Sequence, residues 1–254
     1  MRFSIITVCR NSESTIAQCI ESVLSQTNVD IEYILIDGNS TDATVAVINE
    51  YQQHISTLVS EPDNGIYDAM NKGLSIATGD VIGFLNADDF YTSNSALLTI
   101  QHEFEKNDID ACYGDLCYVS QNDTDNVIRY WKSNEFKKGL FSKGWNPPHP
   151  TFYVKKEIYD RHGYFDLSYS IASDIDLMMR FLEKYEIRTN YIPETLVHMR
   201  LGGETNKSIS NIIKQNRQIL QSFNNNQVQY SLLQYIVGKV SSRAGQYLSR
   251  PEHR

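Results

Sequence analysis

The hydrophobic positions of this chain fall into short apolar runs that alternate with amphipathic segments. The run Val81–Leu85 (VIGFL) has no polar break, which is typical of a strand buried on both faces of a sheet. Three earlier runs, at residues 3–8, 33–36 and 57–60, have a similar aliphatic and β-branched character, although the last is weaker. Because a helical segment separates each run from the next, the pattern predicts four mostly parallel strands joined by right-handed crossovers.

The segments between these runs carry apolar residues at helical spacing. We expect Ser12 or Ser14 to cap the first helix, and Gly79 to follow the end of the third. The predicted apolar faces are formed by Ile16, Ile20, Val23 and Leu24 in the first helix, by Val45, Val47 and Ile48 in the second, and by Met70, Leu74 and Ala77 in the third, which spans about residues 67–77.

The second half of the chain has a different pattern. Residues 111–118 and 127–131 predict a hairpin around a polar turn, and the Gly- and Pro-rich stretch 136–150 predicts a loop over the site. We also expect a strand at 151–154, a short helix ending near Gly163, a helix that opens at Asp174, strands at 188–192 and 195–198, and helices from Ile209 onward. The predicted fold class is α/β, a mostly parallel sheet flanked by helices, with a C-terminal helical extension. No internal repeat or domain linker stands out.

The composition argues against several classes of protein. The 254 residues suffice for one α/β domain, and 31 Asp and Glu against 23 Lys and Arg argue against a nucleic-acid binder, which would need a basic face. Cys9, Cys19, Cys112 and Cys117 show no metal-ligand spacing, which fits a reduced, cytoplasmic compartment. The first residues predict a strand rather than a signal peptide, and no run of 18 apolar residues predicts a membrane span.

Polar side chains follow each of the four predicted strands. Because the carboxyl ends of parallel strands lie at one edge of a sheet, ligands bind there. Two adjacent carboxylates after a buried strand cost free energy unless a positive group is near, and Mg²⁺ with a substrate phosphate is a common solution. The alternative interpretation is a solvated turn, in which Asp is common. The residues at this edge are Arg10, Asn11, Asp37, Asp63, Asp88 and Asp89.

Five stretches of the chain resemble motifs of the inverting glycosyltransferases of family 2, which have the GT-A fold. They are, in chain order, SIITVCRN, LIDGNSTDAT, SEPDNGIYDAMNKG, GFLNADDF and IASDIDLMMRF. The third is most similar to bacterial enzymes that build exopolysaccharide, capsule, colanic acid or O-antigen units. The resemblance covers about residues 3–203. It implies a Rossmann-like GT-A domain at 1–205, with a nucleotide-sugar-binding half at 1–110 and an acceptor and catalytic half at 111–205, followed by a helical extension at 206–254.

The resemblance implies that most nucleotide-binding residues lie in the first half. The loop that contains Thr7, Cys9 and Asn11 would wrap the nucleotide, and Asp37 would contact the base or ribose. Gly38 stands where many family members have a second Asp. Further contacts to the nucleotide or its diphosphate are expected from Asp63, Asp68, Lys72, Asp88 and Arg200. For Lys72, a solvated residue on the helix surface is an equally good interpretation.

The resemblance also implies a site for Mg²⁺ or Mn²⁺ with Asp88 and Asp89 as ligands. Asn86 replaces the leading Asp of the family motif, which lowers the negative charge but keeps an oxygen that can accept a hydrogen bond. His198 is a candidate third ligand because imidazole commonly binds metals, and a buried, hydrogen-bonded histidine is the alternative. Arg200 is the better candidate of that loop for the diphosphate.

Asp174 matches the acid that acts as general base in this family, and Ser173 replaces the Glu that often precedes it. A carboxylate within hydrogen-bond reach of a sugar hydroxyl can remove its proton as the new bond forms. Asp176 lies two residues later on a helix, about 200° around its axis, so we expect only Asp174 to face the site. His149 fits a role in the site or a plain loop role equally well.

Two features of the chain could help to hold an acceptor: its tryptophans and its C-terminal segment. Trp131 and Trp145 could stack on an acceptor sugar or fill the core, and we favour the core for Trp131. Residues 230–237, followed by Lys239 and Arg243, form an apolar and basic segment that could dock on the inner membrane face beside a lipid-linked acceptor. A helix packed on the domain or in a homodimer is the alternative.

The predicted function is transfer of a sugar, with inversion, from a nucleotide-diphosphate donor to a saccharide or lipid-linked saccharide in bacterial surface polysaccharide synthesis. By resemblance the donor is a UDP-sugar. A dehydrogenase or a sugar nucleotidyltransferase would need a Gly-rich turn after the first strand, and residues 9–12 contain no Gly. The non-enzymatic alternative, suggested by Asn86 and Ser173, is an inactive sugar-nucleotide-binding or scaffold subunit of the same pathway.

Overall fold

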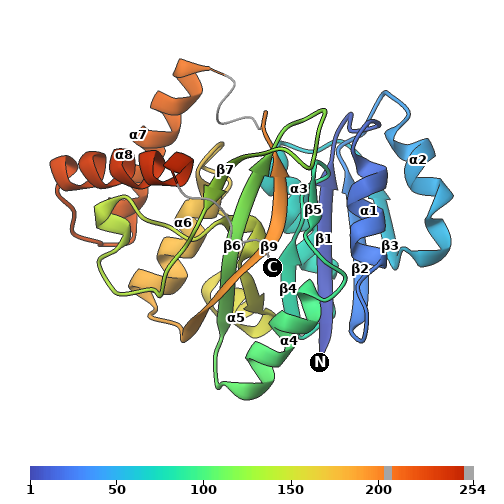
Figure 1. Cartoon of the computed structure of the whole chain (residues 1–254), viewed down its shortest axis with the longest axis horizontal. Helices are drawn as coiled ribbons and strands as arrows, with labels where there is room; N and C mark the ends of the chain where they lie inside the picture. Colours follow the sequence, from blue (N-terminus) through green and yellow to red (C-terminus); the bar gives the residue numbers. More distant parts are fainter. Residues whose placement is uncertain (203–207, 249–254) are drawn as a thin grey trace.

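The computed structural model of the chain describes residues 1–202 and 208–248. Its first half alternates strands and helices as the hydrophobic pattern predicts (Figure 1). The elements are β1 (Arg2–Cys9), α1 (Ile16–Leu24), β2 (Asp30–Asp37), α2 (Thr44–Glu50), the 3₁₀ turn η1 (Gln52–His54), β3 (Thr57–Ser60), α3 (Ile66–Ile76) and β4 (Val81–Phe84).

These four strands form a parallel sheet in the order β3-β2-β1-β4. Cys9 at the end of β1 lies opposite Asp37 of β2, and Asp37 lies opposite Ser60 of β3. β1, β2 and β3 therefore end together, β4 ends opposite Ile6 of β1, and the polar residues that follow the strands gather at one edge of the sheet, as the sequence predicts.

The second half extends the same sheet. β8 lies between β4 and β6 and is antiparallel to both, β9 is parallel to β6, β5 is antiparallel to β9, and β7 forms the predicted hairpin with β6. The strands here are β5 (Asp89–Tyr91), β6 (Ala111–Val119), β7 (Val127–Trp131), β8 (Tyr153–Lys155) and β9 (Thr189–Arg200). The helices are α4 (Ala96–Lys106), η2 (Phe141–Lys143), η3 (His149–Thr151), α5 (Lys156–His162), α6 (Ser173–Met179), the π-helical turn η4 (Arg180–Lys184), α7 (Ile209–Asn225) and α8 (Leu232–Leu248).

Three details differ from the sequence-based expectations. β5 and α4 were not predicted, and the two strands expected at 188–192 and 195–198 form one strand, β9. The strand survives Pro193 because its pairing with β6 shifts in register between Tyr113 and Asp115, which absorbs the residue that cannot donate a hydrogen bond. Neither Ser12 nor Ser14 caps α1 with its side chain; the helix begins after Thr15. The hydroxyl of Ser12 donates to the carbonyl of Arg10 instead.

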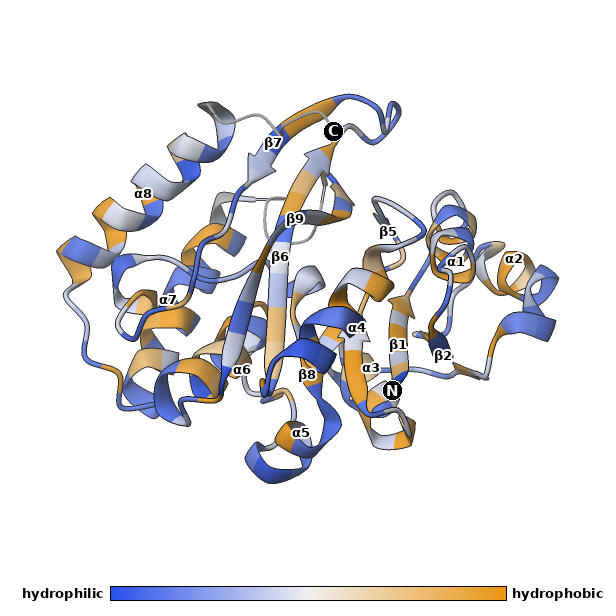
Figure 2. Cartoon of the chain, turned by 60° about the horizontal axis from the view of Figure 1, so that its bottom comes forward, coloured by the Kyte–Doolittle hydropathy of each residue, from blue (hydrophilic) through white to orange (hydrophobic). Residues whose placement is uncertain are grey.

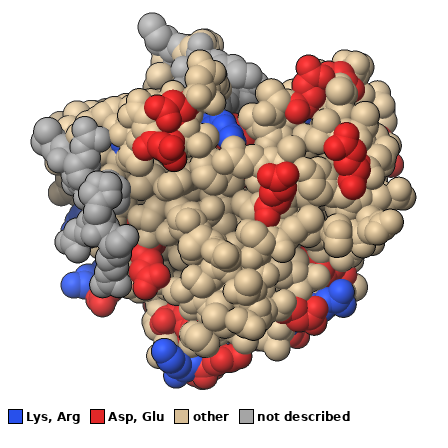
Figure 3. Space-filling view, turned by 45° about the vertical axis from the view of Figure 1, so that its right-hand side comes forward, with Lys and Arg blue, Asp and Glu red and all other residues tan. Residues whose placement is uncertain are grey.

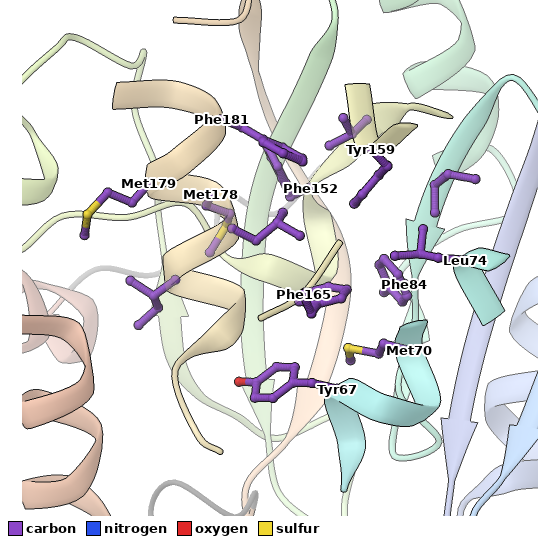
Figure 4. Close-up of a cluster of buried hydrophobic side chains, with 14 of the residues drawn as sticks. Tyr67, Met70, Leu74, Phe84, Phe152, Tyr159, Phe165, Met178, Met179 and Phe181 are labelled. Atoms are coloured by element: carbon purple, nitrogen blue, oxygen red, sulfur yellow. The ribbon is translucent and has the colours of Figure 1, made fainter. Parts of the chain in front are cut away.

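The sheet separates two layers of helices. Alternate residues of β1 show why, because Phe3 and Ile5 face α1, α2 and α4, whereas Ile6 and Val8 face the layer that contains α3, α5, α6 and α7. Figure 4 shows the second layer's core, in which Met70 and Leu74 of α3 pack near Phe84, Phe165 and side chains of α6. This αβα arrangement confirms the predicted fold class.

The C-terminal helices pack on the second half of the sheet, far from α1 and α2 (Figure 1). A Cβ atom on Gly238 would lie 1.8 Å from the carbonyl oxygen of Lys143, and one on Gly144 would lie 2.5 Å from the amide nitrogen of Lys239. Two glycines thus let α8 approach the η2 turn closely. No helix in the described ranges is long and apolar enough to cross a membrane. The expected boundary between residues 205 and 206, and Gly203, lie outside the described residues.

Asp176 of α6 ties α7 to the domain. Its Oδ1 accepts hydrogen bonds from Ser222 Oγ at 2.6 Å and Asn226 Nδ2 at 2.8 Å, and its Oδ2 lies 3.6 Å from Arg180 Nη1. The side chain is almost fully buried, and burial raises the pKa of its carboxyl group, an effect that these donors oppose. Asp176 therefore has a structural role and points away from the predicted site.

We expect the Asp176→Ala variant to lose roughly 2 to 4 kcal/mol of unfolding free energy, because it leaves the partly buried Arg180 and two buried donors without their acceptor. Urea unfolding followed by circular dichroism measures this loss. Asp160→Ala, which removes an exposed ion pair with Lys156 in α5, is the matched control and should change the unfolding free energy by less than about 1 kcal/mol. Equal stability of the two variants would contradict the structural role of Asp176.

Candidate active site

A cleft of about 850 Å³ opens at the carboxyl ends of the parallel strands. Its walls come from the loop after β1, the β3–α3 loop, the β4–β5 turn, η3, the start of α6, the end of β9, and the two C-terminal helices. Of the predicted site residues, those that line this cleft are Cys9, Asn11, Asp63, Asp88, Asp174 and Arg200. The topology therefore brings candidate nucleotide-binding, metal-binding and catalytic residues into one cleft.

Asn11 fixes the loop after β1 in shape. Its backbone has φ of 50°, a left-handed conformation that Asn tolerates better than most residues. Its Oδ1 accepts a hydrogen bond from the amide of Thr41 at 2.9 Å, and its own amide donates to Ser40 Oγ at 2.8 Å. The loops after β1 and β2 are thus held together at the wall of the cleft.

Asp37 lies beneath this wall rather than in the cleft. Its side chain is fully buried and accepts hydrogen bonds from the amide of Ser40 at 3.1 Å, from Ser60 Oγ at 2.6 Å and from the Ser40 hydroxyl. The thiol of Cys9 also points to it, at 3.6 Å. In this geometry Asp37 is therefore not exposed for direct contact with a base or ribose. The carboxylate positions Ser40, which in turn positions Asn11.

Asp63 reaches the cleft above Gly38. A Cβ atom on Gly38 would lie only 2.3 Å from Asp63 Oδ2, so the space that a second Asp would need at position 38 is filled by the carboxylate of Asp63. The other oxygen of Asp63 accepts a hydrogen bond from the amide of Gly65 at 2.8 Å. An acidic group is thus present beside Gly38, although it comes from another loop.

Three other predicted nucleotide contacts do not line the cleft. Thr7 is buried, with its hydroxyl 3.2 Å from Tyr33 Oη. Asp68 accepts a hydrogen bond from the amide of Asn64 at 2.9 Å. Lys72 Nζ lies 2.8 Å from a carboxylate oxygen of Glu61 and donates to the carbonyl of Pro62. Asp68 and Lys72 thus stabilise the β3–α3 loop, so the geometry favours the structural interpretation of Lys72.

The turn between β4 and β5 holds oxygen atoms that suit a metal ion. Asn86 Oδ1 and Asp89 Oδ1 are buried, and neither has a hydrogen-bond partner within the described residues. Asn86 Nδ2 donates to Asp89 Oδ2 at 3.1 Å, and Asp88 lines the cleft beside them. Hard divalent cations prefer such oxygen ligands and complete their coordination with substrate phosphates. No cluster of three or more His, Cys, Asp or Glu suits a metal in the ranges 1–202 and 208–248. A metal ion here would therefore also need the amide oxygen of Asn86 and phosphate oxygens of a bound substrate as ligands.

The electrostatics of Asp89 agree with this fit. Burial raises the pKa of its carboxyl group well above the usual range, and the charge of Asp88 raises it further. Asn86 and Arg200 act in the opposite direction. Arg200 is itself nearly buried, and its guanidinium donates to the carbonyl of Asp88 at 2.7 Å and to Gln18. Asp89 thus lies beneath the cleft, where a nearby positive charge would stabilise its ionised form, and Arg200 lies beside the same turn.

His198 does not belong to this group of ligands. Asp89 of β5 is paired with Met199 of β9, and Phe90 is paired with His198, so Asp89 and His198 point to opposite faces of the sheet. The imidazole packs edge-on against Phe90 with a centroid distance of 5.2 Å, and burial lowers its pKa. This geometry therefore gives no support to the prediction of His198 as a metal ligand.

Asp174 lies at the start of α6 and faces the cleft, as the helical rotation predicts. Its Oδ1 accepts a hydrogen bond from Tyr67 Oη at 2.8 Å, a contact across 107 residues that the sequence did not reveal. Figure 4 shows the Tyr67 hydroxyl directed away from the core cluster that holds its ring. Within the described residues no hydrogen bond reaches the other carboxylate oxygen, Oδ2, so the carboxylate is oriented by Tyr67 and still has an open acceptor.

Aromatic rings build the rest of this part of the cleft. His149 lies in the cleft wall, stacked on Phe84 and edge-on to Phe165, and burial lowers its pKa against the opposing charge of Asp174. Trp131 also lines the cleft, stacked on Tyr118. Trp145 packs among Phe136, Phe141 and Tyr113 instead. Both tryptophans are partly buried and pack against a core cluster, so a core contact of Trp131 is present, but of the two only Trp131 also lines the cleft.

Sequence reasoning also missed cleft residues from the C-terminal helices. Lys214 of α7 and Lys239 and Arg243 of α8 line the same cleft as Asp174. Their side chains reach it because α7 and α8 fold back over the loop after β7, and no short-range pattern encodes that return. The available signal is the basic character of Lys239 and Arg243, which the sequence alone connects equally well with a membrane surface and with a helix packed on the domain or in a homodimer.

Comparison with known proteins gives a consistent result. The family model described as Glycosyl transferase family 2 matches residues 4–161. A protein of Mycobacterium bovis named PGL/p-HBAD biosynthesis glycosyltransferase is 28% identical over 209 residues, which cover 80% of this chain and 79% of that protein.

Solved structures of similar fold are also glycosyltransferases. A crystal structure of residues 1–349 of TarS from S. aureus superposes with a TM-score of 0.68 at 18% identity, covering 95% of this chain and 72% of that one. A mannosyltransferase of Pyrobaculum calidifontis, solved in complex with GDP-Man and Mn²⁺, gives a TM-score of 0.65 at 18% identity and covers 97% of this chain and 69% of that one. These likenesses show the shared GT-A fold.

We expect Asp88→Asn and Asp89→Asn to weaken Mn²⁺ binding in the presence of UDP by roughly 10- to 100-fold, because each removes a negative charge from the oxygen-rich turn. Electron paramagnetic resonance of free Mn²⁺ measures this without any turnover. His198→Gln is the matched control, since its side chain points to the other face of the sheet. A loss of Mn²⁺ affinity in His198→Gln equal to that in Asp88→Asn would overturn the assignment of the turn.

Proposed function

Because the chain belongs to Glycosyl transferase family 2, we propose that it transfers a sugar from a nucleotide-diphosphate donor to a hydroxyl group of an acceptor, with inversion at the anomeric carbon. The observation that carries this proposal is the carboxylate of Asp174, held by Tyr67 in the same cleft as the oxygen-rich turn of Asn86 and Asp88. A base and a site for the leaving group are what a single displacement requires.

The donor is proposed to bind in the first half, residues 1–110, and to be a UDP-sugar. Structures of TarS have been solved with UDP and with UDP-GlcNAc, and the Pyrobaculum mannosyltransferase was solved with GDP-Man. The walls formed by Asn11 and Asp63 support a nucleotide at this edge of the sheet. Asp63 is the acid best able to contact the base or ribose, since Asp37 is buried below.

The diphosphate of the donor is proposed to lie near the β4–β5 turn. Asp88, Asp89 and the amide oxygen of Asn86 would hold Mg²⁺ or Mn²⁺, which when bound stabilises the negative charge that develops on the departing diphosphate. Arg200 lies beside this turn through its bond to the carbonyl of Asp88 and supplies fixed positive charge.

Asp174 is proposed to act as the general base. It accepts the proton of the acceptor hydroxyl while that oxygen forms a bond to the anomeric carbon. The bond between the anomeric carbon and the diphosphate oxygen breaks, and its electron pair leaves with the nucleoside diphosphate. Tyr67 orients the carboxylate from below, and burial together with the charge of Asp174 raises the pKa of the Tyr67 hydroxyl, which keeps it protonated as a donor.

The acceptor is proposed to be a saccharide or a lipid-linked saccharide used in bacterial surface polysaccharide synthesis. Support comes from the resemblance to enzymes of such pathways and from the relative named for PGL/p-HBAD biosynthesis. The acceptor would enter the half formed by residues 111–205 and the C-terminal extension, where Trp131 and His149 line the cleft. A cytoplasmic chain that contacts the inner membrane face, alone or as a homodimer, would meet a lipid-linked acceptor.

The scaffold alternative rests on Asn86 and Ser173, and the geometry weakens both arguments. Ser173 is fully buried and donates to the carbonyl of Asp166 at 2.8 Å, so a Glu at this position would not reach the cleft in this packing. Asn86 keeps an unpartnered oxygen at the turn. Neither replacement removes a group that the proposed reaction uses.

We expect Asp174→Asn to reduce the transfer rate by a factor on the order of 10² to 10⁴ while donor affinity and unfolding free energy stay close to those of the parent. The amide keeps the shape and can still accept from Tyr67, but it cannot take a proton. Single-turnover transfer measured by mass spectrometry and donor binding measured by calorimetry separate the two effects. A fully active Asp174→Asn would assign the base elsewhere, with His149 as the next residue in the cleft.

Tyr67→Phe is the companion variant, because it keeps the ring in the core and removes only the hydrogen bond to Asp174. We expect a smaller loss of rate than for Asp174→Asn, roughly tenfold, since the base is present but less well oriented. An unchanged rate for Tyr67→Phe would show that Asp174 needs no support from this hydroxyl.

The stereochemistry provides a test that needs no variant. Direct attack opposite the leaving group should convert an α-linked donor into a β-linked product, and nuclear magnetic resonance of the product linkage reads this out. A product with retained configuration would exclude single displacement by an acceptor hydroxyl activated by Asp174.

A further inference from the structure

The C-terminal part of the chain differs in charge from the rest. The whole chain has a formal net charge of −8, yet no acidic residue occurs between Glu204 and Glu252. The basic residues of the described part of this segment are Lys214, Arg217, Lys239 and Arg243. By contrast, the face in Figure 3 carries many acidic and few basic side chains. Positive charge is therefore concentrated on α7 and α8.

Three of these cations, Lys214, Lys239 and Arg243, line the cleft. In the part of the chain that the structure describes, no carboxylate lies within ion-pair distance of any of the three. Some cations elsewhere in the described residues are compensated, as Arg180 is by Asp176 and Arg188 is by Asp108 and Asp110. Uncompensated positive charge on a cleft wall attracts an anion.

Lys239 is the most firmly held of the three. Its Nζ donates to Asn216 Oδ1 at 2.8 Å and lies 3.1 Å from Tyr235 Oη, and its backbone is fixed against Gly144. Both partners are neutral, so they orient the ammonium group without cancelling its charge. Burial and the neighbouring charge of Arg243 lower the pKa of Lys239 to about 8, which leaves it mostly charged at neutral pH.

An aromatic wall lies next to these cations. Tyr118 and Trp131 stack on each other and both line the cleft. The nearly buried guanidinium of Arg129 lies 3.6 Å from the centre of the Tyr118 ring, and its Nε has no hydrogen-bond partner among the described residues. Stacked aromatic rings suit a sugar face, and Arg129 adds positive potential behind them.

The donor's own diphosphate does not explain this group of cations. The turn of Asp88 and Arg200 is the proposed site of that diphosphate at the ends of the parallel strands, whereas α8 packs on η2 and lies at the opposite end of the molecule from α1 and α2 (Figure 1). Asp174 lines the same cleft as the loops after β1 and β3 and as α7 and α8, so a base, a donor and an acceptor anion can share it.

On the basis of the proposed glycosyltransferase function, we propose that the acceptor carries a phosphate or diphosphate group. Lys239, Arg243 and Lys214 bind this anion at the C-terminal end of the cleft, while Tyr118 and Trp131 contact the acceptor sugar. Phosphate oxygens accept charge-assisted hydrogen bonds from ammonium and guanidinium groups, so two or three cations form a suitable site. The proposal identifies the class of acceptor and assigns its recognition to helices outside the region matched by the family model.

The outer face of α8 bears on the source of that phosphate. Leu233 is 73% exposed and Val240 is 65% exposed, and at helical spacing both lie on the side of α8 opposite the buried Tyr235. Figure 2 shows hydrophobic residues distributed along α8. A phosphate attached to an alkyl chain would extend past this apolar face, whereas a soluble sugar phosphate would not use it. The test therefore needs one probe of each kind.

Binding is measured on the full chain with UDP and Mg²⁺ in excess, so that the donor half is filled. The probes are glucose 1-phosphate and octyl phosphate, compared with methyl glucoside and octyl glucoside, and the readouts are calorimetry and the fluorescence of Trp131 in the cleft. We expect at least one phosphate probe to bind and its neutral counterpart to bind at least about tenfold more weakly. Binding of octyl phosphate alone assigns a lipid source, and binding of both assigns the phosphate itself.

The double variant Lys239→Met/Arg243→Met should weaken binding of the phosphate probe by roughly tenfold or more and leave UDP affinity unchanged. Arg243→Met alone is a second variant in case removal of Lys239 perturbs folding, because the side chain of Arg243 is exposed. Arg217→Met is the matched control, because it removes an exposed cation of α7 that does not line the cleft.

Three results would overturn the proposal: phosphate probes that bind no better than neutral ones, phosphate probes displaced by rising UDP, or equal weakening in Arg217→Met. UDP binding and donor hydrolysis report on the proposed glycosyltransferase function separately. A chain that binds UDP but no phosphate probe would keep the transferase and lose the anionic acceptor.

Discussion

The desolvation of one carboxylate constrains the whole candidate site. Asp89 follows the buried strand β4 and is itself completely buried, with one oxygen that has no partner among the described residues. A charge in such a position is costly unless a cation lies near, and the nearby Arg200, whose charge lowers the pKa of Asp89, donates its hydrogen bonds to the carbonyl of Asp88 and to Gln18. The turn therefore suits the divalent cation that we propose for the donor diphosphate, and the other groups of the cleft lie around that position.

Much of the fold could be predicted because the information is local. Apolar runs fixed the parallel strands and their common edge, and helical rotation separated Asp174 from Asp176. The same local pattern could not reveal that β9 crosses Pro193 as a single strand, because a register shift in β6 absorbs the irregularity. It could not reveal β5 either, since Asp89–Tyr91 is three residues long and its pairing partner lies more than a hundred residues away.

The site was harder to predict because the burial of a side chain and the direction in which it points depend on packing. Asp37 and Asp63 are both acids after strands, yet one lies beneath the cleft wall and the other in the cleft. His198 and Met199 differ by one position, and strand alternation directs them to opposite faces. The hydrogen bond from Tyr67 to Asp174 and the return of α7 and α8 to the cleft are long-range contacts, for which no spacing in the sequence provides a signal.

The close approach of α8 to η2 has a consequence for how such a protein can diversify. Gly144 and Gly238 allow the helix to touch the turn, and both lie outside every donor loop. Any side chain at Gly238 would force the helix outward and withdraw Lys239 and Arg243 from the cleft together. If α7 and α8 bind the acceptor as we propose, a single mutation there alters acceptor recognition and leaves the proposed donor half unchanged. Under that proposal, recognition of the two substrates can evolve independently within one chain.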